Sequence, residues 1–354
     1  MRFYVDRDIR EIATRLGGDA KRFAGRTILV SGGHGFFGRY FIAAFQYLNK
    51  KVLAKPCHLV ALDNHITSGS SALDDGIGKG YRFIEHDIIT PLKLEGQVDY
   101  VIQAAGIASP YYYRKYPLET LEVATTGTKN LLMLARQHPV KGFIFFSSSE
   151  IYGDPDHRHV PTRESYRGNV SCLGPRACYD ESKRVGETLC EIFHTVNGVP
   201  TKIVRPFNVY GPGMRESDYR MLPNLASRIV GGKPLHIYGT GKQTRTFCYI
   251  TDAIVGFLKV LLDGTPGQAY NIGNPTPEVS MLQLVAVVER VLKRKLPVEI
   301  VEYPDSYPAD EPQRRCPDIN KAVVQLKYKP AVGLHDGLKR FLTWTTGHYT
   351  GSQF

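Results

Sequence analysis

Near its start, the chain passes from a short β-branched run into a glycine-rich turn and then into an apolar segment with helical spacing. Residues 27–31 read TILVS and are predicted to form a strand, and glycines follow at positions 32, 35 and 38. In this context Gly32 permits a tight turn, Gly35 lets a diphosphate approach the backbone, and Gly38 lets the helix pack close to the strand. The segment therefore predicts the first unit of a Rossmann fold, with the diphosphate of a dinucleotide over the helix N-terminus.

The next predicted strand, HLVALDN, ends in Asp63, 25 residues after Gly38. An acid at this place can accept hydrogen bonds from both hydroxyls of the adenosine ribose, although the usual interval is roughly 20 residues. Its carboxylate would repel a 2′-phosphate, which favours NAD over NADP. A solvated acid at a strand end is the alternative interpretation of Asp63.

Strands and helices alternate along the following chain. YRFIEHDI, VDYVIQAAG and KGFIFFSSSEIYG are predicted strands, and residues 117–137 are predicted to form one long helix. This order predicts an α/β fold, a Rossmann doubly wound parallel sheet whose ligands bind at the carboxyl ends of the strands. The residues expected to contact the cofactor there are Gly32, Gly35, Phe36, Phe37, Gly38, Asp63, Asn64, Asp87, Ile88, Ala105, Tyr179 and Lys183.

A tyrosine and a lysine stand four residues apart in ACYDESKR, residues 177–184. On a helix, Tyr179 and Lys183 share one face, with their Cβ atoms roughly 5–6 Å apart. A cation there stabilises a phenolate, so we expect the pKa of Tyr179 to lie below its ordinary value of about 10, which would suit a general acid or base. An ordinary surface pair is the alternative, since this spacing is common by chance.

The strict alternation weakens after about residue 205, which divides the predicted architecture into three parts. Residues 1–25 form an N-terminal extension with a short amphipathic helix at 8–16, packed on the body of the protein or on a partner subunit. Residues 26–205 form the Rossmann domain. Residues 206–354 form a smaller α/β domain for the substrate, partly interleaved with the first.

Composition and charge narrow the class of protein. Hydrophobic residues make up 42% of the 354 positions, no apolar run is long enough to span a membrane, and the N-terminus has no apolar signal segment. The net charge of +11 comes from scattered lysines and arginines, so we expect a small phosphorylated anion rather than nucleic acid. The six cysteines have no metal-ligand spacing, so we expect no metal, and predict buried or half-buried thiols in a reducing, cytoplasmic compartment.

Together these segments resemble the extended short-chain dehydrogenase/reductases that modify nucleotide sugars, over residues 26–345. Within that family the chain is similar to the UDP-glucuronate decarboxylases, which make UDP-xylose. The resemblance is carried by SSSEIYGDP (147–155), GPRACYDESKR (174–184), FNVYGP (207–212), YGTGKQTRTFCYITD (238–252), NIGNP (271–275) and DEPQRRCPDINKA (310–322). It implies NAD as a bound cofactor, a UDP-sugar substrate, and a homodimer built on the helices near 117–137 and 176–197.

The resemblance also implies catalytic roles for four residues. Tyr179 would take the proton from the sugar 4-hydroxyl during oxidation at C4, Lys183 would hold the phenol ionised and bind the nicotinamide ribose, and Ser148 would hydrogen-bond the 4-oxygen. A ketone at C4 lies β to the carboxylate on C5, so carbon dioxide can leave, and Glu150 is the candidate for positioning the chemistry at C5. A turn hydroxyl is the alternative for Ser148, and a buried acid that fixes the turn is the alternative for Glu150.

Ser149 separates two reactions. The related 4,6-dehydratases carry an Asp–Glu pair here, in which the Asp protonates a departing hydroxyl, whereas this chain has Ser149 before Glu150. The missing acid favours glucuronate as the sugar, and the presence of Glu150 disfavours a simple 4-epimerase. A nucleotide-sugar 4,6-dehydratase or 4-epimerase on another sugar is one alternative. A non-catalytic NAD-binding regulator is another, although such proteins typically lose the tyrosine or the lysine.

The diphosphate and base of the substrate need cations, amides and a pocket. By the resemblance, Arg245 and Arg315 match positions that contact phosphate or sugar, because arginine suits bidentate recognition of phosphate. Asn208 would contact the diphosphate, and Tyr238 belongs to a strand that lines the base pocket. Arg220 and Asn224 are weaker candidates, and a surface ion pair is the alternative for each arginine.

Several positions depart from the decarboxylase pattern. They are His34, Gly106, Ile107, Tyr112, Ala124, Ser171 and Gly213, and Arg215 is a candidate to replace an arginine that is common at 213. Most lie where the sugar or the cofactor phosphates are expected. They leave the family assignment unchanged and the exact sugar open.

Overall fold

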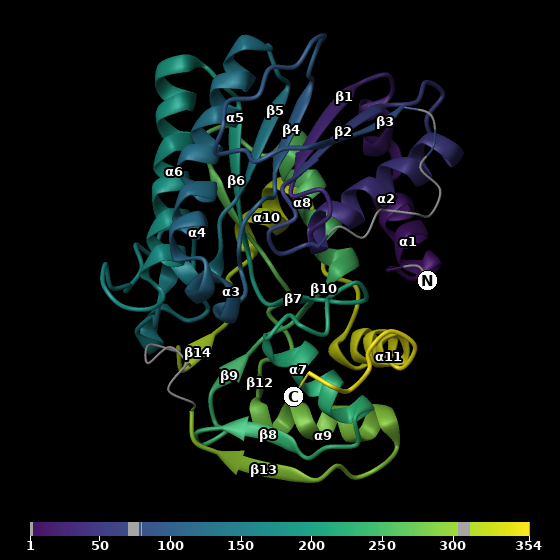
Figure 1. Cartoon of the computed structure of the whole chain (residues 1–354), viewed down its shortest axis with the longest axis vertical. Coiled ribbons are helices and arrows are strands. Elements are labelled where there is room, and N and C mark those ends of the chain that lie inside the picture. The colour runs from purple at the N-terminus through teal and green to yellow at the C-terminus, as the bar shows by residue number, and fades with distance from the viewer. Residues whose placement is uncertain (1–2, 70–77, 79, 304–311, 354) are drawn as a thin grey trace.

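The computed structural model describes residues 3–69, 78, 80–303 and 312–353. Its centre is a seven-stranded sheet in the order β11–β6–β5–β4–β1–β2–β3, and every pairing between neighbours is parallel (Figure 1). The strands are β1 (Thr27–Ser31), β2 (His58–Asp63), β3 (Tyr81–Glu85), β4 (Tyr100–Gln103), β5 (Gly142–Phe146), β6 (Thr201–Pro206) and β11 (Ala269–Ile272). The predicted doubly wound α/β fold is confirmed.

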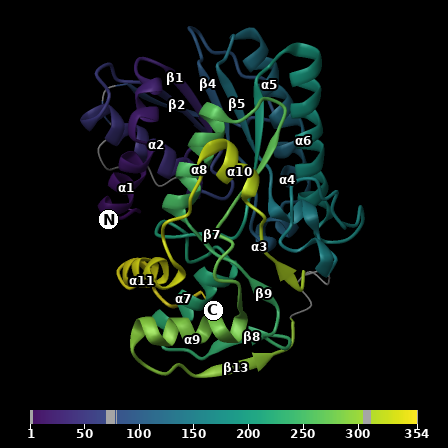
Figure 2. The same cartoon turned by 180° about the vertical axis from the view of Figure 1, so that it is seen from behind.

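Helices cover both faces of this sheet (Figures 1 and 2). One face carries α4 (Pro117–Ala124), α5 (Thr126–Gln137) and α6 (Ala177–Asn197), and the other carries α1 (Asp6–Leu16), α2 (Phe36–Lys51) and α8 (Ile250–Asp263). Side chains on β1 alternate between the two cores: Leu29 packs with the first group of helices, and Ile28 and Val30 pack with the second. Both faces of the sheet are therefore buried, as parallel sheets require.

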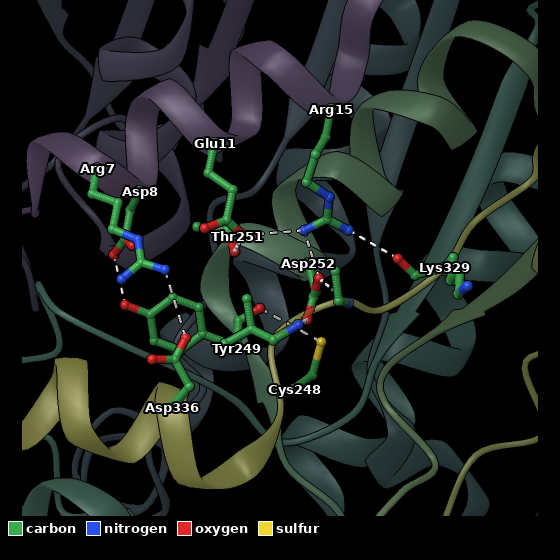
Figure 3. Close-up of polar contacts among 12 residues, drawn as sticks. Arg7, Asp8, Glu11, Arg15, Cys248, Tyr249, Thr251, Asp252, Lys329 and Asp336 are labelled. Atoms are coloured by element: carbon green, nitrogen blue, oxygen red, sulfur yellow. Dashed lines mark hydrogen bonds and ion pairs between the residues drawn. The ribbon is translucent and has the colours of Figure 1, made fainter.

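The N-terminal helix α1 packs on α2 and α8, which confirms packing on the body of the protein (Figure 3). Asp8 is fully buried and accepts a hydrogen bond from the Tyr249 hydroxyl at 2.6 Å. Arg15 of the same helix pairs with buried Asp252 at 2.6 Å and donates to the Lys329 carbonyl oxygen at 2.9 Å. A 3₁₀ turn, η1 (Gly17–Phe23), then leads into β1.

The remaining elements form a smaller region below the sheet in Figure 1. It contains three small sheets: β7 (Val209–Tyr210) with β10 (Cys248–Tyr249), β8 (Leu235–Tyr238) with β13 (Val298–Val301), and β9 (Thr244–Arg245) between β12 (Val279–Ser280) and β14 (Arg314–Arg315). Its helices are α7 (Met221–Val230), α9 (Met281–Leu292) and α11 (Leu334–Thr345). Between them the chain returns to the large sheet, because α8 and β11 pack on β6 and α10 (Asn320–Leu326) packs on α8.

Two details differ from the sequence predictions. The predicted helix at 117–137 is two helices, α4 and α5, which meet at Thr125. The helix breaks there because the sequence Thr-Thr-Gly has low helix propensity and because the Thr125 hydroxyl donates to the Leu121 carbonyl oxygen at 2.8 Å. Cys172 is exposed rather than buried, because it lies in the loop before α6. The other five cysteines are buried or half-buried, as predicted, and all six are free thiols.

Candidate active site

A cavity of about 340 Å³ opens at the carboxyl ends of the central strands. Its wall includes Gly32 beyond β1, Asp63 at the end of β2, Ala105 beyond β4, Ser148 beyond β5 and Asn208 beyond β6. Ligands of doubly wound sheets bind at this edge. The cavity is therefore the candidate site, and the predicted residues can be placed relative to it.

The glycine turn has the shape that its sequence predicts. Gly32 has a φ of 70°, and a Cβ there would lie 2.8 Å from the backbone of Ala105. A Cβ on Gly38 would overlap the carbonyl oxygen of Gly32, so α2 reaches the turn only because position 38 has no side chain. Gly35, Phe36 and Phe37 line the cavity where α2 begins. Free N–H groups at a helix N-terminus favour a diphosphate at that point.

Asp63 is a buried acceptor rather than a solvated acid. One carboxylate oxygen accepts from the His65 N–H at 2.8 Å and the Ser68 hydroxyl at 2.7 Å, and the other accepts from the His34 N–H at 2.9 Å. A carboxylate has about four acceptor positions, so these bonds fix its orientation and leave capacity for a ribose hydroxyl. The expected ribose contact stays a prediction.

The other residues expected at the cofactor lie along the same wall. Asn64 donates to the Asp87 carboxylate at 2.9 Å, which joins the ends of β2 and β3. Asn64, Asp87, Ile88 and Ala105 all line the cavity. The structure thus brings together every predicted cofactor residue except Gly38, which lies beneath the turn.

Tyr179 and Lys183 lie on α6 and both line the cavity. The Lys183 ammonium lies 5.7 Å from the centroid of the Tyr179 ring and donates to the Phe146 carbonyl oxygen at 2.8 Å. Burial raises the pKa of Tyr179 to about 12, although a hydrogen bond from Ser148 lowers it, and burial lowers the pKa of Lys183 to about 8. The expected lowering of the Tyr179 pKa is wrong for this protein environment, because desolvation of the phenolate, together with the charges of Glu150 and Asp180, outweighs the hydrogen bond from Ser148 and the charge of Arg220.

Ser148 is the N-cap of a 3₁₀ turn, η2 (Ser149–Tyr152), after β5, and Glu150 lies within that turn. The Ser148 hydroxyl accepts from the Glu150 N–H at 3.2 Å and also hydrogen-bonds Tyr179. It therefore acts as a turn hydroxyl and reaches the phenol at the same time. Ser149 is buried and lines the cavity with both neighbours.

Glu150 belongs to a cluster of buried charges. Arg315 from β14 binds both carboxylate oxygens, one at 2.7 Å, and Arg176 at the start of α6 also contacts Glu150. Burial raises the pKa of Glu150, but the charges of Arg315, Arg176 and Arg245 outweigh burial and hold the pKa below its ordinary value. Asp180, 3.3 Å from Arg176, has its pKa raised to about 7 by burial and by the charge of Glu150. Glu150 is thus an anion on the cavity wall, and its carboxylate is fixed by Arg315 and Arg176.

The predicted substrate residues divide into two groups. Ser149 and Asn208 line the cavity, and so does Arg220, which pairs with Asp218 at 2.5 Å. The cavity wall does not include Tyr238, Arg245, Arg315 or Asn224. Arg245 donates to the carbonyl oxygens of residues 244, 312 and 313, and Tyr238 stacks on Tyr303 with ring centroids 5.7 Å apart. Their contacts with phosphate and base stay predictions.

Sequence reasoning missed Arg39, which lines this wall, and three residues that contact the wall from outside the cavity lining. Arg176 and Asp180 flank Tyr179 in a matched segment, but only the folded chain shows that they share charges with Glu150. Tyr113 of α3 (Pro110–Lys115) stacks on Tyr179 with ring centroids 5.5 Å apart. Arg39, directly after the last glycine, also lines the cavity. The sequence could have indicated Arg39, because it directly follows Gly38 of the glycine turn.

Comparison with known proteins agrees with this geometry. The model of the NAD dependent epimerase/dehydratase family matches residues 28–273. The chain belongs to this family. UDP-glucuronic acid decarboxylase 1 of Arabidopsis thaliana is 36% identical over 318 residues, which cover 89% of this chain and 69% of that protein.

Solved structures of family members share the fold. A dTDP-glucose 4,6-dehydratase from Streptomyces venezuelae, DesIV with NAD bound, has a TM-score of 0.77 and 25% identity, over 91% of this chain and 97% of that one. The UDP-glucuronic acid 4-epimerase of Bacillus cereus, in complex with UDP-glucuronic acid and NAD, has a TM-score of 0.74 and 27% identity, over 91% of this chain and 100% of that one.

The residues present fit the NAD of this family. The glycine turn has no room for Cβ atoms at positions 32 and 38, Asp63 accepts a hydrogen bond from the His34 N–H within that turn, and Lys183 lines the same cavity. Among the described residues, no group of three or more histidine, cysteine or acidic side chains is arranged to hold a metal ion. No helix in the described ranges has the length and apolar character needed to cross a membrane.

Proposed function

We propose that this family member catalyses the NAD-dependent decarboxylation of UDP-glucuronate to UDP-xylose or to its 4-keto pentose precursor. The observation that carries the proposal is the pair Ser149–Glu150, placed beside Tyr179 on one cavity wall with Arg315 and Arg176 on the Glu150 carboxylate. A carboxylate neutralised by two arginines permits a substrate carboxylate nearby, whereas an unpaired acid would repel it. The similarity to a plant UDP-glucuronic acid decarboxylase supports the same substrate.

In the first step, Tyr179 accepts the proton of the sugar 4-hydroxyl. When bound, NAD supplies the hydride acceptor for C4, returns the hydride later, and carries a positive charge on its oxidised ring. Burial keeps the phenol of Tyr179 neutral at pH 7. Tyr179 would therefore become a base when the positive charge of the oxidised cofactor lies close to the phenol. Ser148 donates to the Tyr179 oxygen and keeps it in line with the substrate oxygen.

In the second step, the 4-ketone withdraws electrons from C5 and carbon dioxide leaves from the C5 carboxylate. The resulting enolate is stabilised by donors directed at its oxygen, for which Ser148 and Tyr179 are placed. Glu150 orients a solvent water at C5, and this water supplies the proton that replaces the lost carbon dioxide. Because Arg315 and Arg176 hold it ionised, Glu150 acts through hydrogen bonding rather than as the initial acid.

The substrate diphosphate is assigned to the side of the cavity formed by β7 and α7. Asn208 lines it, although its amide already donates to the Thr246 carbonyl oxygen at 2.8 Å. Arg220 lines it as well and is held by Asp218. Arg245 and Arg315 reach phosphate or sugar only if the contacts that they make in this structure rearrange.

We also propose a cytoplasmic homodimer formed through α4 and α6, which lie side by side in both views (Figures 1 and 2). These helices carry large apolar side chains in solvent, among them Leu118 at 61% exposure and Val196 at 74% exposure. Covering such residues is a common reason for association. Sedimentation should give a dimer for the native chain and a monomer for a Leu118→Glu, Val196→Glu variant. A native monomer would refute the interface.

The function is tested by incubating the purified protein with UDP-glucuronate and NAD and identifying the nucleotide sugars by mass spectrometry. A UDP-pentose formed with loss of carbon dioxide is the expected result. An isomer of unchanged mass would indicate a 4-epimerase. In a parallel incubation with UDP-glucose, whose sugar is uncharged, loss of water without any reaction of UDP-glucuronate would indicate a 4,6-dehydratase. Bound NAD with no turnover of any nucleotide sugar would favour the regulator.

A further inference from the structure

Two arginines on the cavity wall make no ion pair with any acidic residue that the structure describes. Arg39 lies in the first turns of α2, and Arg215 lies in the loop between β7 and α7. Within the part of the chain that the structure describes, neither guanidinium donates a hydrogen bond or pairs with a carboxylate. Arg220, on the same wall, is bound by Asp218 through two short contacts. Among the described residues, Arg39 and Arg215 therefore line the cavity without a directly bound carboxylate, and Arg215 receives only the longer-range charges of Asp63 and Asp218.

These two cations are also close enough to repel each other. Burial and the charge of Arg215 lower the pKa of Arg39 to about 10, and burial lowers the pKa of Arg215. Holding two like charges in a partly buried wall costs free energy unless an anion stands between or beside them. The arrangement thus favours a ligand with negative charge.

The N-terminal segment holds one of the two arginines. The guanidinium carbon of Arg39 lies 4.0 Å from the centroid of the Phe3 ring, a cation–π contact. Phe3 also packs edge-on against Tyr40, whose hydroxyl donates to the Pro212 carbonyl oxygen at 3.0 Å. A Cβ on Gly213 would lie 3.0 Å from the Phe3 carbonyl oxygen and 3.1 Å from its ring. Glycine at 213 therefore makes room for Phe3.

The position of the pair identifies the kind of anion. Arg39 follows the glycine turn directly, and Arg215 comes within 3.1 Å of where a Cβ on Gly69 would stand, in the loop after Asp63. The Asp63 charge acts on Arg215, and His34, whose pKa burial lowers, stacks on Phe83 beside them. The glycine turn and Asp63 are the two places where a dinucleotide carries its diphosphate and its adenosine ribose.

We propose that Arg39 and Arg215 bind a phosphate group of the dinucleotide, and that the N-terminal segment positions Arg39 through Phe3. The inference rests on the proposed use of a dinucleotide cofactor. Guanidinium groups bind phosphate oxygens through charge-assisted, often bidentate hydrogen bonds. The phosphate is either part of the diphosphate, present in both NAD and NADP, or the 2′-phosphate of NADP. If the pair binds the 2′-phosphate, the protein would also accept NADP, whereas Asp63 alone favours NAD.

The test is a calorimetric titration of the full-length protein with NAD, NADP and adenosine. The variants are Arg39→Gln, Arg215→Gln and Phe3→Leu. Arg290→Gln, at an exposed position of α9, is a control that removes the same charge outside the cavity. Loss of either cavity arginine should weaken dinucleotide binding by about tenfold to 100-fold, and Phe3→Leu by several-fold, because charge-assisted bonds are lost or misdirected. Adenosine binding should not change, since adenosine has no phosphate.

The pattern across ligands identifies the phosphate. Equal weakening of NAD and NADP assigns the pair to the diphosphate, and weakening of NADP alone assigns it to the 2′-phosphate. Because the arginines repel each other, Arg215→Gln should leave the thermal midpoint of the free protein unchanged or raise it. Folded variants that bind both dinucleotides like the native chain would overturn the inference alone. A native chain that binds neither dinucleotide would overturn the proposed function as well.

Discussion

Replacing Glu150 with glutamine separates its structural from its chemical role. The side chain is 20% exposed and accepts hydrogen bonds from Arg315 and Arg176. Removing one partner of a buried ion pair typically costs about 3–5 kcal/mol. In the glutamine variant the amide oxygen can still accept a hydrogen bond from an arginine, and Asp180, 3.3 Å from Arg176, still balances the charge of Arg176. We therefore expect the free energy of unfolding to fall by about 3 kcal/mol, the lower end of that range.

The chemistry should change in a selective way. Tyr179, Ser148 and Lys183 are left in place, so oxidation at C4 should proceed within a few-fold of the native rate. The step at C5 loses the carboxylate that positions the groups acting there, and misplacement of reacting groups can slow a step by about 100-fold. Single-turnover mixing, with reduced cofactor followed by absorbance and UDP-pentose by quenched sampling, should therefore show a reduced species that persists.

Glu278→Gln is the matched control. Glu278 is also 20% exposed and bound twice by an arginine, Arg314 at 2.6 and 2.7 Å, but Arg314 is 41% exposed and the pair lies outside the cavity. Urea unfolding should show a loss of about 1 kcal/mol, as for a solvated pair, with unchanged turnover. The reasoning fails if Glu150→Gln slows oxidation as much as it slows product formation, or if the control shows the same kinetic defect.

Three further substitutions test single contacts. Tyr179→Phe should abolish oxidation while calorimetry still shows NAD binding, because only the proton acceptor is removed; residual turnover near the native rate would exclude its role. Asp180→Asn should remove a pH dependence of stability, because the pKa of Asp180 is about 7 in the folded protein and about 3.9 in the unfolded chain. In denaturant titrations the native chain should therefore lose stability relative to the variant as the pH rises from 4 to 7. A difference in stability that does not change with pH would refute the shift. Gly38→Ala should lower both the thermal midpoint and NAD affinity, because its Cβ meets the Gly32 carbonyl oxygen, and unchanged values for both would contradict the close packing.

The sequence predicted those features that follow from local pattern. The glycine spacing, the β-branched strands and the alternation of elements predicted the parallel sheet and the cavity edge, because each depends on residues close together in the chain. The same reasoning placed Tyr179, Lys183, Ser148 and Asp63 on one wall. It also predicted the N-terminal helix within two residues of its observed start.

Features that depend on long-range contacts were not predictable. Arg315 and Glu150 are 165 residues apart, and only the folded chain shows that they bind each other. The pKa of Tyr179 was mispredicted because helical spacing shows that Lys183 is near but not that the phenol is buried, and burial is the largest cause of the raised pKa. The break at Thr125 was missed because a continuous apolar pattern runs through α4 and α5. The pattern also does not show that a Cβ on nearby Gly127 would meet the Ile88 side chain, a contact between segments distant in the sequence.

Release of carbon dioxide is the most direct test of the proposed reaction. UDP-glucuronate labelled with ¹³C in its carboxylate would be incubated with the purified protein and NAD, and labelled carbon dioxide would be measured against UDP-pentose formed. We predict equal amounts of the two products, and neither product with Tyr179→Phe. Retention of the label in a six-carbon nucleotide sugar, with the native chain active, would contradict decarboxylation and assign the oxidation at C4 to an epimerase.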